Sequence, residues 1–373
     1  MTTRWTPAAR QLIRGGCPAA RCPPGTCHRR FEPLPHEVVK SFEQAPPEAR
    51  ELLSRRISDL GLQIVGTPLE PMVERLYGEL AAKELHRFRP VCYLSDEWSC
   101  PDREPIIGIP FYLANAHLRE IERAANDLED DRDAMMYLRH EAGHAFNYAY
   151  ELFNRRDWVE QFGPFDRPYV DDYRPVPFSR RFVRHIAGWY AQKHPDEDFA
   201  ETFAVWLTPG SEWRQRYAGW PVLAKLEYVE AVARELSDRD PTHALAAAVA
   251  ETPVEQMEMT VEEFYREHRV DETLAITDLA VDGELCDIFA ARGPIAAAAF
   301  VARHRKALLD KIAYWTGLRR SLVGAMLDTV EARSGTLNLR VEEGAEERTL
   351  VELAAFATTL STNYLHRGAW SER

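Results

Sequence analysis

The feature that most constrains this chain is a pair of histidines four residues apart inside a helical pattern. His140-Glu141-Ala142-Gly143-His144 lies within YLRHEAGHAFNYAY, and the apolar residues on both sides keep α-helical periodicity. Residues i and i+4 of a helix stand one turn apart on the same face, so the two imidazoles can bind one metal ion. Glu141 lies beside them, placed to take a proton from water at that metal. An ordinary solvated helix turn could carry the same five residues, so the context of the motif decides its interpretation.

A catalytic zinc ion needs a third protein ligand and one open coordination position. The third histidine of the extended HExxHxxGxxH pattern is absent, because Asn147 and Tyr150 occupy its Gly and His positions. The segment HPDEDFAETFAVWL instead offers Glu197 and Glu201, four residues apart on one helical face. We predict Glu197 as the ligand and Glu201 as the carboxylate that orients a ligating histidine through its other ring nitrogen. Glu201 or Asp198 as the ligand are the alternatives.

HEAGH followed by this acidic segment resembles the gluzincin metallopeptidases, and more narrowly a group of zinc-binding metallopeptidases with a similar downstream segment. The resemblance covers about residues 88–210. It implies a zincin-like fold and one catalytic Zn²⁺. It also implies site roles that agree with the prediction from the residues: ligands His140, His144 and Glu197, general base Glu141, and Glu201 behind a zinc-bound histidine.

A distant member of the same group has a tyrosine seven residues before its ligand glutamate, and that tyrosine assists the reaction. Tyr190 holds this position before Glu197. The resemblance therefore implies a hydrogen bond from Tyr190 to the developing oxyanion, although an aromatic residue of the core is the alternative. Other polar candidates are His185 and His194 for contacts in the transition state, and Arg180, Arg181 and Arg184 for a substrate carboxylate. Surface or structural positions are the simpler interpretation of these five.

The pattern along the chain predicts an α+β fold that is mainly helical. RPVCYLS and PIIGIPFYL are expected to form a strand, a loop and a second strand, with PIIGIPFYL as the edge against which an extended peptide pairs. An ordered loop is expected over residues 154–184. The expected helices are at residues 48–60, 71–85, 115–128, 132–153 and from 195 onward. The expected domains are a basic Cys/Pro-rich segment over 1–35, a zincin-like catalytic domain over 36–240 and a helical C-terminal domain over 241–373.

Charge and composition exclude other classes of function. The chain has 46 Lys+Arg against 59 Asp+Glu, a formal charge of −13, which argues against nucleic acid as a partner. No apolar run is long enough for a membrane span, and the N-terminal residues lack the apolar core of a secretory signal, so a cytoplasmic location is expected. Cys17, Cys22, Cys27 and His28 are possible soft ligands, but their even spacing is atypical of structural zinc, and a second metal there stays open.

These observations predict a zinc-dependent metallopeptidase that hydrolyses peptide bonds in a peptide or protein substrate. Two alternatives remain. One is a zinc-stabilised protein that binds a partner with little turnover, against which Glu141 argues, because a non-catalytic zinc site needs no base. The other is a hydrolase of non-peptide amides that uses the same residues. The pattern leaves cleavage specificity and oligomeric state open.

Overall fold

The computed structural model describes residues 45–125, 128–169, 173, 175–242, 249–267 and 279–370. Over these residues the protein is mainly helical with few strands, which is compatible with the expected α+β class. The basic segment over 1–35, with Cys17, Cys22, Cys27 and His28, lies outside the described residues, and its second metal site stays a prediction. None of the described helices combines the length and apolar character that crossing a membrane requires.

Buried apolar side chains form two hydrophobic cores, one drawn from residues 45–265 and one from residues 279–370. The elements of the first core are, in chain order, α1 (Pro47–Arg50), η2 (Ser58–Leu60), α2 (Leu69–Ala82), β1 (Val91–Ser95), β2 (Ile106–Pro110), η3 (Phe111–Ala114), α3 (Ala116–Ala125), α4 (Asp131–Ala149), η4 (Leu152–Asn154), α5 (Arg156–Phe162), η5 (Tyr190–Gln192), α6 (Pro195–Leu207), α7 (Trp213–Arg216), α8 (Leu223–Leu236), η7 (Val254–Gln256) and α9 (Val261–Glu267). Those of the second core are α11 (Asp282–Ile288), β3 (Ile295–Ala296), α12 (Ala297–Thr316), α13 (Arg320–Thr336), β4 (Arg340–Val341) and α14 (Glu346–Arg367).

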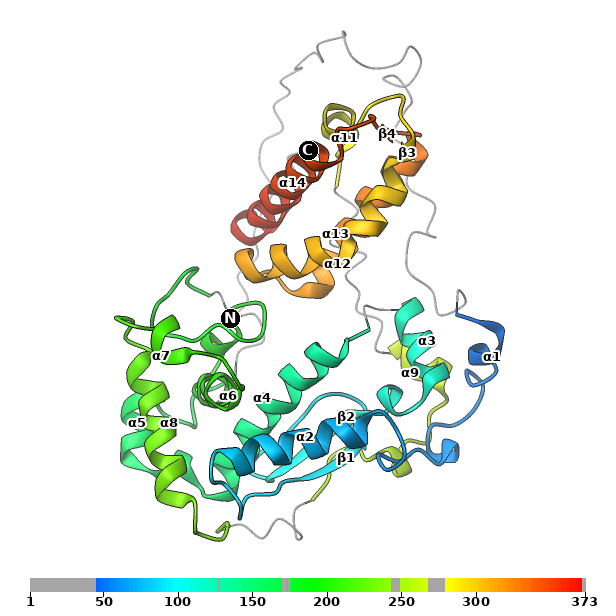
Figure 1. Cartoon of the computed structure of the whole chain (residues 1–373). Helices are drawn as coiled ribbons and strands as arrows, with labels where there is room; N and C mark the ends of the chain where they lie inside the picture. Colours follow the sequence, from blue (N-terminus) through cyan, green and yellow to red (C-terminus); the bar gives the residue numbers. More distant parts are fainter. Residues whose placement is uncertain are drawn as a thin grey trace, which may run out of the picture.

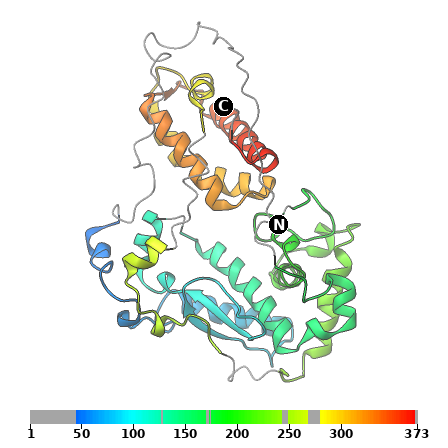
Figure 2. The same cartoon turned by 180° about the vertical axis from the view of Figure 1, so that it is seen from behind.

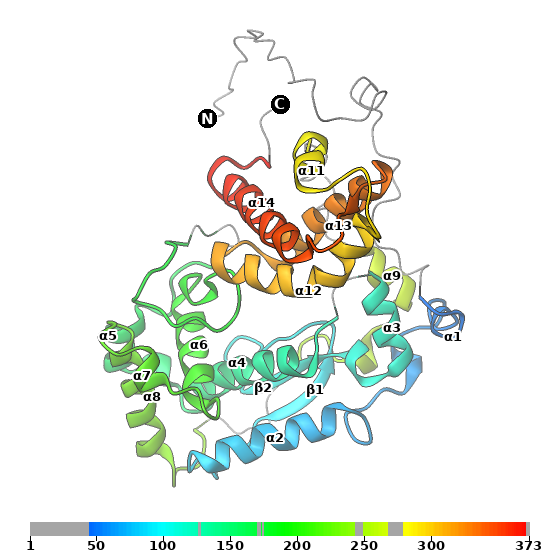
Figure 3. The same cartoon turned by 45° about the horizontal axis from the view of Figure 1, so that its top comes forward.

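The elements of the second core gather at one end of the molecule, at the top of Figure 1. The predicted domain division at residue 240 stays a prediction. Val254, Met257 and Phe264 come after residue 240 in the chain but pack in the first core. Figure 3 shows α12 lying above α4 and α6, and Lys306 of α12 pairs with Asp130 and Asp133 at the start of α4, at 3.1 and 3.4 Å.

The helix expected over residues 48–60 is wrong for most of its length. The structure has only α1 and the short η2 there, separated by turns. Tertiary hydrogen bonds explain the difference: the N–H groups of Ile57 and Ser58 donate to the carbonyl oxygens of Met259 and Met257, at 3.0 and 3.1 Å. The backbone bonds to a distant segment instead of to its own preceding turn, so tertiary contacts override the helical pattern.

The two expected strands are present as β1 and β2, which pair in parallel and, seen from behind in Figure 2, lie in front of α2. β2 is an outer strand of this two-stranded sheet, as expected, but the edge predicted to pair with an extended peptide is already occupied at Gly108. Gly108 of β2 exchanges both of its backbone hydrogen bonds with Ser99, at 2.8 and 3.2 Å, because the loop after β1 folds back along β2. β2 therefore has β1 on one side and this loop on the other.

Helix α4, which carries HEAGH, starts at a defined cap and is fixed by a buried ion pair. The Asp130 carboxylate accepts hydrogen bonds from the backbone N–H groups of Arg132 and Asp133, both at 2.9 Å, which satisfies the first free donors of the helix. Arg139 donates two hydrogen bonds of 2.7 Å to Glu79 of α2, and both side chains are buried. Because breaking a buried pair typically costs ~3–5 kcal/mol, this contact holds α4 firmly against α2.

Helix α6 packs directly on α4. It begins at His194, whose side chain accepts the N–H of Asp196, and Pro195 occupies its first turn. All thirteen residues of α6 are buried. The two helices meet most closely at the glycine of HEAGH: a Cβ atom at position 143 would lie 2.7 Å from the Cα and 2.9 Å from the carbonyl oxygen of Ala200.

This contact generates a prediction about Gly143. In an exposed helix Gly→Ala stabilises by up to ~1 kcal/mol, and we expect that gain for Gly78→Ala on α2, where a Cβ would meet nothing within 4 Å. Gly143→Ala should instead destabilise by ~1–3 kcal/mol, because the backbone of α6 must move away. It should also weaken metal binding by the site described below. Urea unfolding and metal titration of both variants check this; a Gly143→Ala protein as stable as Gly78→Ala would contradict it.

Candidate metal centre

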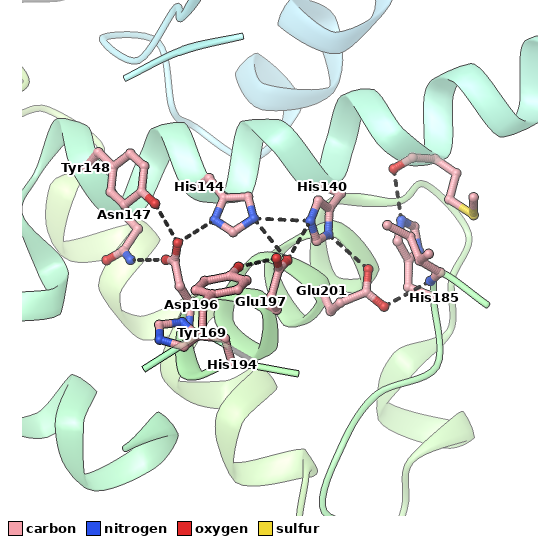
Figure 4. Close-up of polar contacts among 12 residues, drawn as sticks. His140, His144, Asn147, Tyr148, Tyr169, His185, His194, Asp196, Glu197 and Glu201 are labelled. Carbon is pink, nitrogen blue, oxygen red and sulfur yellow. Dashed lines mark hydrogen bonds and ion pairs between the residues drawn. The ribbon is translucent and has the colours of Figure 1, made fainter. Parts of the chain in front are cut away.

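Two histidines of α4 face three acidic side chains of α6 across the contact between the helices (Figure 4). His140 and His144 lie one turn apart on α4, and Asp196, Glu197 and Glu201 lie on the first two turns of α6. All five are buried. Because isolated charges are costly in a protein interior, such a cluster requires close pairing between its members.

Three of these residues converge on one point. The Nε2 atoms of His140 and His144 lie 3.1 Å apart, and each faces Oε2 of Glu197, at 3.0 and 3.2 Å. The ligand atoms of this group all lie within 4.8 Å of one another, so the buried His140, His144 and Glu197 could bind a metal ion. Two imidazole nitrogens and one carboxylate oxygen suit several divalent transition metals.

The remaining nitrogen of each imidazole is held by a carboxylate. Nδ1 of His140 donates to Oε1 of Glu201 at 3.0 Å, and the other oxygen of Glu201 accepts the backbone N–H of Ile186 at 2.9 Å. Nδ1 of His144 donates to Oδ2 of Asp196 at 2.8 Å. These bonds turn both Nε2 atoms toward Glu197, as metal-binding histidines require.

Asp196 is held in turn by the second half of the motif helix. Its carboxylate accepts hydrogen bonds from Asn147 at 2.7 Å and from the Tyr148 hydroxyl at 2.5 Å. Asp196 is therefore engaged by three side chains of α4, His144 among them.

The carboxylates of the cluster favour protons on the two histidines. Both nitrogens of His140 face carboxylate oxygens, an arrangement that favours the doubly protonated imidazole. Burial opposes this charge, but the hydrogen bonds to Glu197 and Glu201 outweigh it and raise the pKa of His140 to about 9. Burial likewise opposes charge on His144, yet Asp196 and Glu197 raise its pKa well above the usual value. Burial also works against the charge of Glu197, but the two histidines hold its pKa well below its usual value.

The convergent group opens into a pocket of about 480 Å³ that also contains the other predicted catalytic residues. Glu141 is buried at its wall, and burial raises the pKa of its carboxyl. Tyr190 begins η5, and its ring meets that of His140 edge-on at 5.6 Å. The pocket is lined by Trp98, Ser99, Cys100, Asp102, Arg103, His140, Glu141, His144, Tyr148, Phe165, Asp166, Arg167, Tyr169, Tyr190, His194, Asp196 and Glu197.

The structure separates the alternative ligands from the convergent group. Both oxygens of Glu201 are engaged by His140 Nδ1 and Ile186, so neither faces the Nε2 atoms. Asp198 instead pairs with Lys225 of α8. Glu197 is thus the acidic residue of α6 that faces both Nε2 atoms.

Of the other polar candidates, one histidine lines the pocket, whereas the other histidine and the three arginines do not. His194 lines the pocket but is buried as the cap of α6, with Nε2 donating to the Arg167 carbonyl at 2.7 Å. His185 donates to the Met136 carbonyl at 3.0 Å and is not among the pocket residues. The three arginines are outside the pocket lining as well; the guanidinium of Arg184 lies among aromatic rings, 4.7 Å from Trp189.

Sequence reasoning missed two residues of this site. Asp196 directly precedes the predicted ligand, and an acid in the first turn of a helix is common without any metal nearby. Tyr169 donates a hydrogen bond to Oε1 of Glu197 from a loop that is rich in aromatic residues. The density of that loop in Pro and aromatics was a signal for function, but nothing in the pattern distinguished Tyr169 from its neighbours.

In comparisons with known proteins, no family model, curated protein or solved structure matched the chain.

The protonated cluster predicts that metal affinity depends on pH. A metal ion must displace a proton from His140, whose pKa of about 9 means that the proton is present at neutral pH. The apparent affinity should therefore rise with pH, by up to roughly tenfold per pH unit for each proton displaced, and the rise should continue until His144, whose pKa is also raised, has lost its proton. Titration with zinc and a competing chelator between pH 6 and 10 checks this. An affinity that is constant over this range would contradict it.

Variants of the two glutamates separate a ligand from an orienting residue. Glu197→Ala should abolish metal binding, as should His144→Ala, because each removes a ligand atom. Glu201→Ala should weaken binding by ~10–100-fold, the range typical of a group behind a ligand. Metal analysis and chelator competition measure this, with circular dichroism to confirm the fold. If a folded Glu201→Ala protein lost the metal while Glu197→Ala kept it, the two assignments would be exchanged.

Proposed function

We propose that this protein is a zinc-dependent metallopeptidase of the gluzincin type. His140, His144 and Glu197 would hold one Zn²⁺, and the substrate would be a peptide or protein. The observation that carries the proposal is the convergence of both Nε2 atoms on Glu197 while a separate carboxylate holds each Nδ1. A structural zinc site uses four protein ligands, whereas three ligands beside a pocket suit catalysis.

Zinc is the metal that this donor set favours among the common ions. Hard ions such as Mg²⁺ and Ca²⁺ prefer oxygen ligands, whereas imidazole nitrogens suit zinc and other late transition metals. Two histidines and one glutamate form a known catalytic zinc set. When bound, the ion would polarise the scissile carbonyl and lower the pKa of a water molecule.

The positions of Glu141 and Tyr190 in the pocket support the roles proposed for them. Glu141 would take a proton from the attacking water and deliver it to the leaving amine. Its pKa, which burial raises, makes it a stronger base than an exposed glutamate. Tyr190 would donate a hydrogen bond to the oxyanion that develops on the carbonyl.

The zincin-like fold implied by the resemblance belongs to this proposal. A small sheet, a motif helix and a second helix that carries the acidic residue support it. Because β2 is paired on both sides at Gly108, the edge available to an extended peptide would be the segment that contains Trp98, Ser99 and Cys100, which lines the pocket.

Glu141→Gln tests the proposed reaction. The amide cannot accept a proton, so hydrolysis should fall by ~10²–10⁴-fold while zinc content and fold are retained. The assay is digestion of a peptide library by the zinc-loaded protein, read by mass spectrometry, with Glu141→Gln as the matched control. Undiminished cleavage by this variant would assign the base to another residue. Absence of cleavage by the zinc-loaded wild type would favour a binding protein or a hydrolase of other amides.

A further inference from the structure

The two oxygens of Glu197 have different partners. Oε2 faces the Nε2 atoms of His140 and His144, at 3.0 and 3.2 Å, and is the oxygen placed to bind a metal. Oε1 accepts a hydrogen bond from the hydroxyl of Tyr169 (Figure 4). The carboxylate is thus held between the metal position and a phenol.

Tyr169 is fixed in this position by the residue that caps α6. Its ring stacks on the imidazole of His194, with centroids 4.3 Å apart and an angle of 23° between the planes. His194 accepts the N–H of Asp196 at 3.2 Å and donates to the carbonyl of Arg167 at 2.7 Å. One histidine therefore ties the start of α6, which carries Glu197, to the loop that carries Tyr169.

Packing alone does not explain Tyr169. The residue is 49% exposed, so its ring contributes little to the hydrophobic core, yet its hydroxyl is directed inward at a buried carboxylate. The side chain of Lys193 lies 5.0 Å from the same ring and adds a cation to its face. The main contribution of this half-exposed tyrosine is therefore the hydrogen bond that its hydroxyl donates to Glu197.

We infer that Tyr169 positions Glu197 so that it binds the metal through one oxygen only, an inference that rests on the proposed metal centre. A carboxylate can bind a metal through one oxygen or through both, and a free Oε1 could close onto the ion. That second contact would occupy the position that a catalytic metal must keep open for water. The hydrogen bond from Tyr169 engages Oε1 and keeps this position available. Tyr169 is a positioning residue here, since it acts through Glu197.

Cobalt substitution tests this inference without any assay of activity. Co²⁺ replaces Zn²⁺ at such sites, and its visible absorption per bound ion weakens as the coordination number rises. Tyr169→Phe removes only the hydroxyl, so Glu197 should bind through both oxygens and the absorption of the Co²⁺ protein should fall severalfold. Co²⁺ affinity should change by no more than the ~10–100-fold typical of partners behind the ligands, so the site can still be saturated.

Tyr173→Phe is the matched control. Tyr173 belongs to the same part of the chain, but its hydroxyl donates to the carbonyl of Gly188 at 2.6 Å rather than to Glu197. This variant should keep the wild-type spectrum. Zinc X-ray absorption of the same proteins should show one more oxygen neighbour in Tyr169→Phe than in the wild type and Tyr173→Phe.

An unchanged cobalt spectrum in saturated Tyr169→Phe would overturn the inference. So would complete loss of Co²⁺ binding in a folded Tyr169→Phe protein, because the phenol would then be a ligand itself. These results differ from a failure of the proposed function. A wild type that binds no Co²⁺ would remove the metal centre, whereas a metal-loaded wild type without hydrolysis would leave the positioning role intact.

Discussion

The close approach of α4 and α6 at Gly143 is the contact on which the candidate centre depends. A side chain at this position would meet the backbone of Ala200, so only glycine lets the two helices come this near. At this distance the short side chains of aspartate and histidine can bond directly, as Asp196 and His144 do at 2.8 Å. A wider separation would leave buried charged groups unpaired, at a cost of several kcal/mol for each.

The same contact explains how so many ionisable groups can be buried together. Three carboxylates of α6 face two imidazoles, and protonated imidazoles would offset most of the carboxylate charge. The first turn of α6 adds a favourable dipole, because Asp196 and Glu197 lie at its positive end. Along the same helix contact, the buried rings of Phe146 of α4 and Phe203 of α6 stack with their centroids 5.1 Å apart. A metal ion at the Nε2 atoms would take over the role of the protons.

The sequence was most informative where a chemical pattern coincides with a helical period. HEAGH and the acids of HPDEDFAETFAVWL each lie on one helix, and the fixed rise of a helix places i and i+4 residues together regardless of the remaining fold. Asp196, the partner of His144, was not predictable in this way. It precedes Glu197 by one residue, so it is rotated about the axis of α6 relative to both Glu197 and Glu201. Tyr169 was beyond prediction for another reason: loop residues have no period, and their direction depends on tertiary contacts such as the stacking on His194. The opposite error occurs at residues 48–60. Their sequence has a helical period, but hydrogen bonds with residues 257–259 form there in place of a continuous helix.

The second core is joined to the first at a point next to the pocket. Ala187 packs with the second core, whereas Val183 of the same segment belongs to the first. Gly317, which ends α12, lies so close to the indole of Trp189 that any Cβ at position 317 would overlap the ring. Trp189 itself has a left-handed backbone, with φ of 57°, and the chain passes from it directly into Tyr190 and η5. Such a conformation costs a non-glycine residue ~1–3 kcal/mol and persists only where its surroundings enforce it, and here α12 supplies part of those surroundings. The geometry at Tyr190 is therefore set by both cores, although every predicted ligand and the predicted general base lie on elements of the first.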